Sequence, residues 1–305
     1  DTIVIPPGTI TLPLSLDEDA NATGDIDIRK DLTIQGVGAD RSAIIISGGE
    51  RVFDTFAPAT VTISNMTIRG GFGSNFGGGG GIRNAGTITL TNVTVSGNTS
   101  SSDLGGGIAN SGTMTLTNVT VNGNTATGGG GIVNGGHEQI IIGGAIVVTP
   151  IGGTLSMTGG IVSNNTGGGI FNVAGTATLT DVTISGNTAM SGIRNVDTMT
   201  LTNVTVSGNT SSGPQGFGGG IINIGTLTLT NVTVSGNIAD QFGGGIANLV
   251  VETGSQSGGG VVTQVSASTL TMTNVTVTGN TPGGLLGAEC SGLDCEQGPY
   301  TSQTR

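Results

Sequence analysis

The sequence has few of the side chains that most enzymes use. Its 305 residues include one His, two Cys, one Tyr and no Trp, and charged residues make up only 9% of the chain. General acid–base, nucleophilic and metal chemistry draw mainly on His, Cys, Lys, Tyr and positioned carboxylates. The composition therefore favours a protein that is not an enzyme. No apolar run approaches the roughly 20 residues of a membrane-spanning helix, so we expect no membrane span in this chain.

Positive charge is also scarce. Eight Lys and Arg residues oppose 19 Asp and Glu residues, which gives a formal net charge of -11. Nucleic-acid binding depends on Lys and Arg that neutralise phosphates, so this balance excludes nucleic acid as a partner. Ten of the 19 acids lie within residues 1–54, whereas residues 70–288 contain six acids and two Arg. The middle of the chain is therefore almost uncharged.

Glycine is abundant, with 60 residues, and Thr and Asn are frequent. Gly, Thr and Asn rank low in helix propensity, whereas Thr, Val and Ile suit strands and Gly and Asn suit turns. The glycines have no three-residue period and the chain has only 8 Pro, so it is not a collagen. The composition predicts an all-β protein.

A repeat of about 24 residues runs through most of the chain. In each copy a glycine run is followed by Ile, one variable residue and Asn, as at Ile82 and Asn84. The next block is close to Thr-x-Thr-Leu-Thr-Asn-Val-Thr-Val-Ser-Gly-Asn-Thr, as in residues 87–99. The repeated Ile occupies positions 82, 108, 132, 170, 193, 221 and 246, with spacings of 26, 24, 38, 23, 28 and 25.

Apolar and polar residues alternate within this block. Ile88 and Leu90 alternate with Thr, and after a change of register Val93 and Val95 do the same. Alternation with period two predicts short strands with the apolar residues inward. Three strands in about 24 residues, with no helical segment between copies, describe one coil of a parallel β-helix of about ten coils. A propeller is the alternative, but its blades need about 40 residues and four strands.

The repeated Asn is predicted to form a structural ladder inside the coil stack. Neighbouring coils lie about 4.8 Å apart, so each buried amide can bond to the amides above and below it. The predicted ladder consists of Asn84, Asn110, Asn134, Asn172, Asn195, Asn223 and Asn248.

The chain divides into four kinds of segment. Residues 1–60 are less regular and more charged, which indicates N-terminal capping coils, and residues 61–285 form the repetitive coils. Two inserts, at about 135–153 and 249–268, have a strand, a Gly-rich turn and a second strand, as in a hairpin. The tail, residues 286–305, contains Cys290 and Cys295. A disulfide that closes this small loop is a better interpretation than two free thiols, and it favours an oxidising compartment.

The copies resemble those of a known group of proteins. Gly-Gly-Gly-Ile at residues 79–82, followed by Val-Ser-Gly-Asn at 95–98, is similar to the repeats of polymorphic outer-membrane proteins. The full copy looks closer to the right-handed parallel β-helix repeat proteins of bacterial surfaces, and residues 1–9 and 32–36 are similar to their first coils. The resemblance covers roughly residues 1–290. It implies a right-handed β-helix in a secreted or cell-surface bacterial protein.

We therefore expect a non-enzymatic structural protein, such as an adhesin stalk, an envelope layer or a self-stacking fibre subunit. The open ends of a weakly charged β-helix favour end-to-end self-association, and a cell-surface or glycan ligand is the other expected partner. One alternative is a polysaccharide-active β-helix lyase or hydrolase, which needs converging carboxylates. The regular coils offer only isolated acids, such as Asp181 and Asp197. Another alternative is an ice-binding protein that uses the Thr-x-Thr face.

One acidic segment is a candidate metal site. Carboxylates at alternate positions within a turn are ligands that a hard cation uses, and the segment starts like a calcium-binding loop. We expect either a structural calcium site or a solvated acidic loop, and no other cofactor. The candidate ligands are Asp17, Asp19, Asn21, Asp25 and Asp27.

Overall fold

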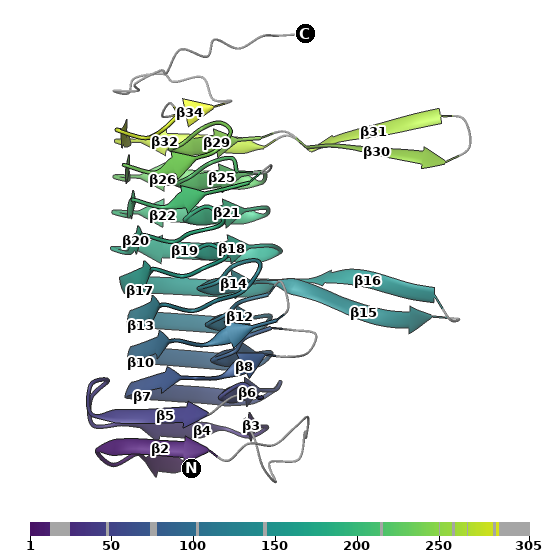
Figure 1. The fold of residues 1–305 in the computed structure, drawn as a ribbon. Helices are drawn as coiled ribbons and strands as arrows, with labels where there is room; N and C mark the ends of the chain where they lie inside the picture. Colours follow the sequence, from purple (N-terminus) through teal and green to yellow (C-terminus); the bar gives the residue numbers. More distant parts are fainter. Residues whose placement is uncertain are drawn as a thin grey trace.

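The computed structural model describes residues 1–12, 25–46, 49–73, 78–101, 104–142, 145–213, 216–249, 251–257, 260–266, 268–282 and 285–286. Every described secondary-structure element is a strand. The strands stack in parallel into a right-handed β-helix of about ten coils, which confirms the predicted fold class (Figure 1). No helix in the described ranges is long and apolar enough to cross a membrane.

The first face of the stack, the threonine face, carries the Thr-x-Thr blocks. Thr points outward and the intervening apolar residues point inward, so that Ile88 and Leu90 are fully buried. Thr89 lies beside Thr115 in the next coil, and this register is kept along the stack. The face consists of β1 (Thr2–Val4), β4 (Leu32–Gln35), β7 (Thr60–Arg69), β10 (Thr87–Ser96), β13 (Thr113–Asn122), β17 (Gly153–Ser163), β19 (Gly175–Thr180), β22 (Thr198–Thr202), β26 (Thr226–Thr230) and β32 (Thr269–Thr273).

The second face, the valine face, follows a bend at Asn. Asn92 and Asn118 have φ angles of 54° and 53°, a left-handed conformation that Asn tolerates better than most residues. In β7, β10, β13 and β17 a single strand runs through the bend and supplies both faces. The other strands of this face are β2 (Gly8–Leu12), β5 (Ser42–Ile46), β20 (Thr183–Ser185), β23 (Thr205–Ser207), β27 (Thr233–Ser235) and β33 (Thr276–Thr278).

The third face, the Ile-x-Asn face, is a separate sheet of short strands. Ile82 and Asn84 both point inward and are fully buried, and the residue between them points outward. A Cβ on Gly81, just before this strand, would lie 2.7 Å from the Gly107 carbonyl oxygen, so the close approach of coils requires glycine there. The strands are β3 (Ile26–Ile28), β6 (Phe53–Thr55), β9 (Ile82–Asn84), β12 (Ile108–Asn110), β14 (Ile132–Asn134), β18 (Ile170–Asn172), β21 (Ile193–Asn195), β25 (Ile221–Asn223), β29 (Ile246–Asn248) and β34 (Leu285–Leu286).

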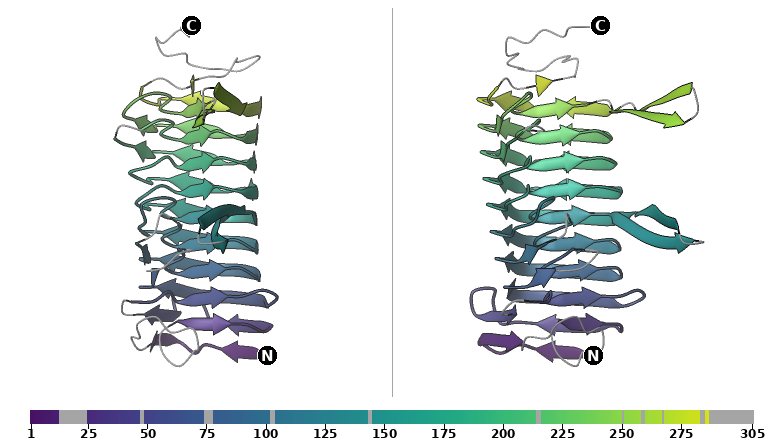
Figure 2. Two further views of the ribbon diagram at one scale, coloured as in Figure 1. Left: turned by 90° about the vertical axis from the view of Figure 1, so that its right-hand side faces the viewer. Right: turned by 45° about the vertical axis from the view of Figure 1, so that its right-hand side comes forward.

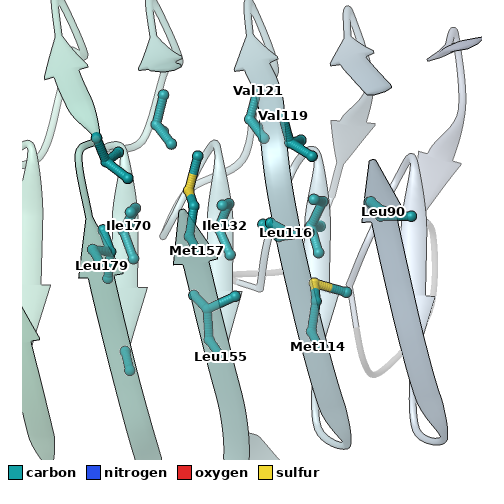
Figure 3. Packing of buried hydrophobic residues seen from close by; sticks show 14 of the residues in the cluster. Leu90, Met114, Leu116, Val119, Val121, Ile132, Leu155, Met157, Ile170 and Leu179 are labelled. Carbon is teal, nitrogen blue, oxygen red and sulfur yellow. The ribbon is translucent and has the colours of Figure 1, made fainter. Parts of the chain in front are cut away.

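The three faces enclose one continuous apolar core. Met114, Leu116, Leu155 and Met157 from neighbouring strands stack above one another and meet Ile132 from the Ile-x-Asn face (Figure 3). Complete burial of such a side chain stabilises the fold by about 1.5–3 kcal/mol relative to exposure. Because a coil cannot bury its inner side alone, this energy is gained only when coils stack.

Two antiparallel hairpins interrupt the coils. They consist of β15 (Gly136–Ile142) with β16 (Ala145–Ile151), and β30 (Val251–Ser257) with β31 (Gly260–Ser266). Both project from the same side of the stack (Figure 2). Two further pairs are short and parallel: β8 (Phe72–Gly73) with β11 (Thr99–Ser100), and β24 (Thr210–Ser211) with β28 (Ile238–Ala239).

Candidate functional site

The candidate site is a group of three carboxylates on the outward side of the Ile-x-Asn face. β3 and β6 pair in parallel, which places Asp27 directly beside Asp54. Asp25 lies two residues before Asp27 and therefore points to the same side of the chain. Carboxylate oxygens of these three residues lie within 4.8 Å of one another. We call Asp25, Asp27 and Asp54 the Asp cluster.

The sequence pattern of the first strands explains this arrangement. In β3, β6 and β9 the first residue of each triplet is apolar and points into the core, so the middle residue faces outward. The register aligns the three middle residues in the order Asp27, Asp54 and Arg83. Neighbouring strands are about 4.8 Å apart, so these charges face each other closely.

Three arginines neutralise part of the negative charge. Arg51 Nη1 lies 2.5 Å from Asp54 Oδ2, and Arg83 Nη1 lies 3.0 Å from the same oxygen. Arg29 Nη2 lies 3.2 Å from Asp27 Oδ2. The guanidinium carbon of Arg29 lies 3.9 Å from the centroid of the Phe56 ring. Asp54 therefore has two guanidinium partners that compensate its charge.

Asp25 differs from its neighbours. It is 8% exposed, and its carboxyl group makes no hydrogen bond or ion pair with another described residue. Burial raises the pKa of Asp25 from 3.8 to about 7, the Arg51 charge opposes this, and the charges of Asp27, Asp54 and Glu50 add to it. Asp25 is thus a carboxyl group that takes up and releases a proton near neutral pH.

The Asp cluster also has the donors that a divalent cation uses. Ca²⁺ binds carboxylate oxygens at about 2.3–2.6 Å, so oxygens up to about 5 Å apart can contact one ion. The 4.8 Å limit satisfies this condition. A cation here would need further oxygen ligands and would compete with Arg51 and Arg83 for Asp54. The residues therefore fit a cation through three ligands.

The predicted calcium segment is only partly described. Asp25 and Asp27 take part in the Asp cluster, together with Asp54 from the next coil, which the sequence did not suggest. Asp17, Asp19 and Asn21 lie outside the described residues, as do Cys290 and Cys295.

The repeated Asn residues form a continuous chain of side-chain hydrogen bonds. Asn84 Nδ2 donates to Asn110 Oδ1 at 2.8 Å, and Asn110 Nδ2 donates to Asn134 Oδ1 at 2.8 Å. The chain continues through Asn172, Asn195 and Asn223 to Asn248. A second chain, which the sequence analysis did not predict, consists of Asn98, Asn124, Asn165, Asn187, Asn209, Asn237 and Asn280.

The sequence analysis did not identify Asp54, Arg51 or Arg83 as site residues. A signal was available, because the alignment of Ile82 with Phe53 and Ile26 extends the repeat by two coils, with spacings of 29 and 27. That extension would have placed the middle residues of the three triplets in one column.

Comparisons with known proteins give fold similarity at low sequence identity. No protein-family model and no curated protein sequence matches the chain. The pectate lyase Pel9A matches at 12% identity and a TM-score of 0.44, over 91% of this chain and 70% of that chain. The A-module of the Azotobacter vinelandii mannuronan C-5 epimerase AlgE4 matches at 14% identity and a TM-score of 0.40, over 95% of this chain and 91% of that chain. The catalytic domain of a GH87 alpha-1,3-glucanase matches at 15% identity and a TM-score of 0.30, over 95% of this chain and 64% of that chain.

These findings correct two expectations. The three structures named above are polysaccharide-active enzymes, which contradicts the expectation of a non-enzymatic structural protein; the alternative, a polysaccharide-active β-helix enzyme, is taken up below as a proposal. The sequence analysis sought converging carboxylates in the regular coils, whereas Asp25, Asp27 and Asp54 converge in coils that were interpreted as a cap. The likeness to surface repeat proteins extends to the β-helix repeat, and the likeness to polymorphic outer-membrane proteins and adhesins has no support. With TM-scores below 0.5, any proposed activity has to rest on the site itself.

Proposed function

We propose that the protein is a secreted or cell-surface enzyme that cleaves a polysaccharide at the Asp cluster. The observation that carries this proposal is a buried carboxyl group with a pKa near 7 beside two carboxylates that are paired with arginines. Glycoside cleavage needs one carboxyl group that donates a proton and a second that is charged. Different environments provide these two states here.

In this proposal Asp25 is the proton donor to the glycosidic oxygen. Asp27 or Asp54 is the charged partner, which acts as a nucleophile or stabilises positive charge on the sugar ring. The separation of less than 4.8 Å is closer to the about 5–5.5 Å of retaining enzymes than to the about 6.5–9.5 Å of inverting enzymes. The side chains of Asp27 and Asp54 are 2% and 3% exposed, so the proposal requires the substrate to approach from Asp25.

A cation-assisted reaction is the second candidate, because three carboxylate oxygens lie within reach of one ion. Calcium held by Asp25, Asp27 and Asp54 would supply a positive charge that binds an acidic sugar and stabilises negative charge as it develops. Both candidates use the same three residues, and they differ in whether a chelator abolishes the reaction.

The test is cleavage of pectate, alginate and alpha-1,3-glucan, measured as the release of reducing ends. We expect the wild-type protein to cleave one of them and Asp25→Asn to lose about 100-fold or more in rate, the contribution of a general acid. Asp181→Asn is the matched control, because Asp181 is an exposed acid where other coils have Asn. A wild-type protein that cleaves none of these, with and without calcium, contradicts the proposal.

A further inference from the structure

A groove on the valine face lies apart from the Asp cluster. Its volume is about 420 Å³, within the range of sites that hold small ligands. The floor is formed by outward residues of β5, β7, β10 and β13, including Thr94, Ser96 and Asn122. One wall is the loop of residues 39–41, which precedes β5.

Two arginines face this groove without carboxylate partners. Arg41 comes from the wall and Arg69 from the floor, both are exposed, and neither forms an ion pair with a described residue. By contrast, Arg51 and Arg83, which lie beside the Asp cluster, both contact Asp54. Asp40 is the acid that lines the groove. In a chain with 19 acids and eight basic residues, two unpaired guanidinium groups in one groove are a local concentration of positive charge that suits an anion.

One outward column of the valine face carries Ser in the regular coils, and at this groove two of its residues differ from Ser. In the described coils that follow, up to β27, the column contains only Ser. Arg69, Ser96 and Asn122 occupy one column of the valine face, in three successive coils. The Asn122 Oδ1 atom is buried and has no hydrogen-bond donor among the described residues. Buried acceptors without a donor are uncommon in folded proteins. The residues that follow in the column are Ser163, Ser185, Ser207 and Ser235.

The wall of the groove is held in place by hydrogen bonds to two strands. The Gly8 amide donates to the Arg41 carbonyl oxygen at 2.7 Å, and the Thr67 hydroxyl group donates to the Ala39 carbonyl oxygen. Ser42 Oγ also contacts the carbonyl oxygen of Ile5 at 3.2 Å. A fixed wall reduces the conformational entropy that binding would cost.

We infer that this groove binds a short segment of an anionic polysaccharide, and the inference rests on the proposed function for its choice of glycan. Arg41 and Arg69 would bind carboxylate or sulfate groups, since guanidinium groups form paired hydrogen bonds with such anions. Thr94, Ser96 and Asn122 would bond to sugar hydroxyl groups. Arg69 and Asn122 are two coils apart, about 9.6 Å, so the groove extends over more than one sugar unit. The groove is a binding subsite that holds the chain away from the reaction centre.

The experiment is calorimetric titration of the full chain with three tetrasaccharides: tetragalacturonate, a sulfated tetrasaccharide and neutral galactotetraose. We expect one of the two anionic probes to bind, which identifies the anion, and the neutral probe to bind about tenfold more weakly or not at all. Arg69→Ser installs the residue that other coils carry and should weaken binding about tenfold, as should Arg41→Gln. Arg194→Gln lies outside the groove and should change affinity by less than about twofold.

The outcomes separate this inference from the proposed function. If neither anionic probe binds, if Arg69→Ser binds as tightly as the wild type, or if the neutral probe binds equally well, the groove is not an anionic-glycan site. Asp25→Asn should keep full affinity while it loses turnover. Binding at the groove by a protein that cleaves nothing would remove the proposed enzyme and keep the subsite.

Discussion

The first coils and the later coils use the same outward column of the Ile-x-Asn face in different ways. In the first coils this column contains Asp27, Asp54 and Arg83, and in later coils it contains mainly apolar residues such as Val133 and Ile222, with Arg194 as the charged exception. The parallel register is the same in both regions. The core and the backbone pairing do not depend on this outward side chain. The first coils can therefore have charged side chains in the column where the later coils have mostly apolar ones. The N-terminal coils therefore differ from the later coils in carrying a cluster of charged side chains on this face.

The coils of β3 and β6 lack the buried Asn chain that runs from Asn84 to Asn248 in the coils that follow, and we expect the largest difference in stability there. The two hydrogens of Asn134 Nδ2 are shared among three acceptors, Gly153 O, Asn172 Oδ1 and Thr176 O, and its Oδ1 accepts from Asn110. Asn134→Leu leaves several buried groups unpaired, at about 1–3 kcal/mol for each, so we expect a loss of about 3 kcal/mol or more in the free energy of unfolding. Urea unfolding followed by circular dichroism measures it.

The control is Thr55→Val in the first coils. Thr55 takes the place of Asn in the same column, and its Oγ1 atom is buried without a hydrogen-bond partner among the described residues. We expect its free energy of unfolding to change by less than about 1 kcal/mol, because no bond is lost. Equal losses at the two positions would mean that the Asn chain does not stabilise the later coils.

The second prediction concerns the dependence of stability on pH. The folded-state pKa of Asp25 is about 7 and its ordinary value is 3.8, so the folded protein holds this proton more tightly. The stability that the protonated Asp25 contributes is fully present below about pH 4 and is lost as the pH rises through about 7. The Asn side chain of Asp25→Asn cannot ionise, so we expect the variant to gain stability over the wild type as the pH rises. The gain in the free energy of unfolding should be on the order of 2–4 kcal/mol larger at pH 8 than at pH 4.

Thermal unfolding at pH 4 and pH 8 measures this difference. Asp181→Asn, in a regular coil, is the control and should show the same change in melting temperature as the wild type. If Asp25→Asn gains nothing at pH 8, then burial does not disfavour the charged form of Asp25, and its role as proton donor near neutral pH loses its basis.

The third prediction compares two identical triplets. Ile82-Arg83-Asn84 and Ile193-Arg194-Asn195 have the same sequence and position in the coil, but Arg83 pairs with Asp54 whereas Arg194 lies 4.7 Å from the Phe171 ring centroid. Arg83→Ala removes one of the two partners of a buried carboxylate, so we expect a loss of about 1–2 kcal/mol in the free energy of unfolding. Arg194→Ala should cost about 0.5–1 kcal/mol.

Salt distinguishes the two effects. The loss for Arg83→Ala should decrease from low salt to about 1 M NaCl, because the ion pair of the partly exposed Arg83 is screened. The loss for Arg194→Ala should change less. The same salt dependence in both variants would remove the distinction between the two regions.

The smallest effect is expected on the threonine face. Thr200 is an outward residue of β22 with no role in the Asn chains, and Thr200→Val should change the free energy of unfolding by less than about 0.5 kcal/mol. The ice-binding interpretation of this face stays a prediction, and thermal hysteresis of wild type and Thr200→Val at equal concentration measures it. A change in stability above 1 kcal/mol, in either direction, would show that the outward Thr columns stabilise the stack.

The fold followed from the sequence because one coil is repeated with a clear period. Alternation around Ile88 and Val95 fixed which residues point inward, and the positions of Ile and Asn fixed the third face. The Asp cluster did not follow, since Asp25, Asp27 and Asp54 belong to coils whose motif has diverged. Their proximity depends on a register between β3 and β6 that only the folded chain makes evident. The pKa of Asp25 likewise depends on burial, which no local pattern encodes.

The Asn chains also give the stack a direction. In both buried chains the hydrogen bond from one Asn side chain to the next runs toward the C-terminal coils, as from Asn84 to Asn110 and from Asn98 to Asn124. Aligned amide groups polarise one another, so their dipoles add along the axis of the molecule. The carbonyl ends point toward the N-terminal coils, where the Asp cluster lies. The repeat that builds the scaffold thus makes the two ends of each buried chain chemically different.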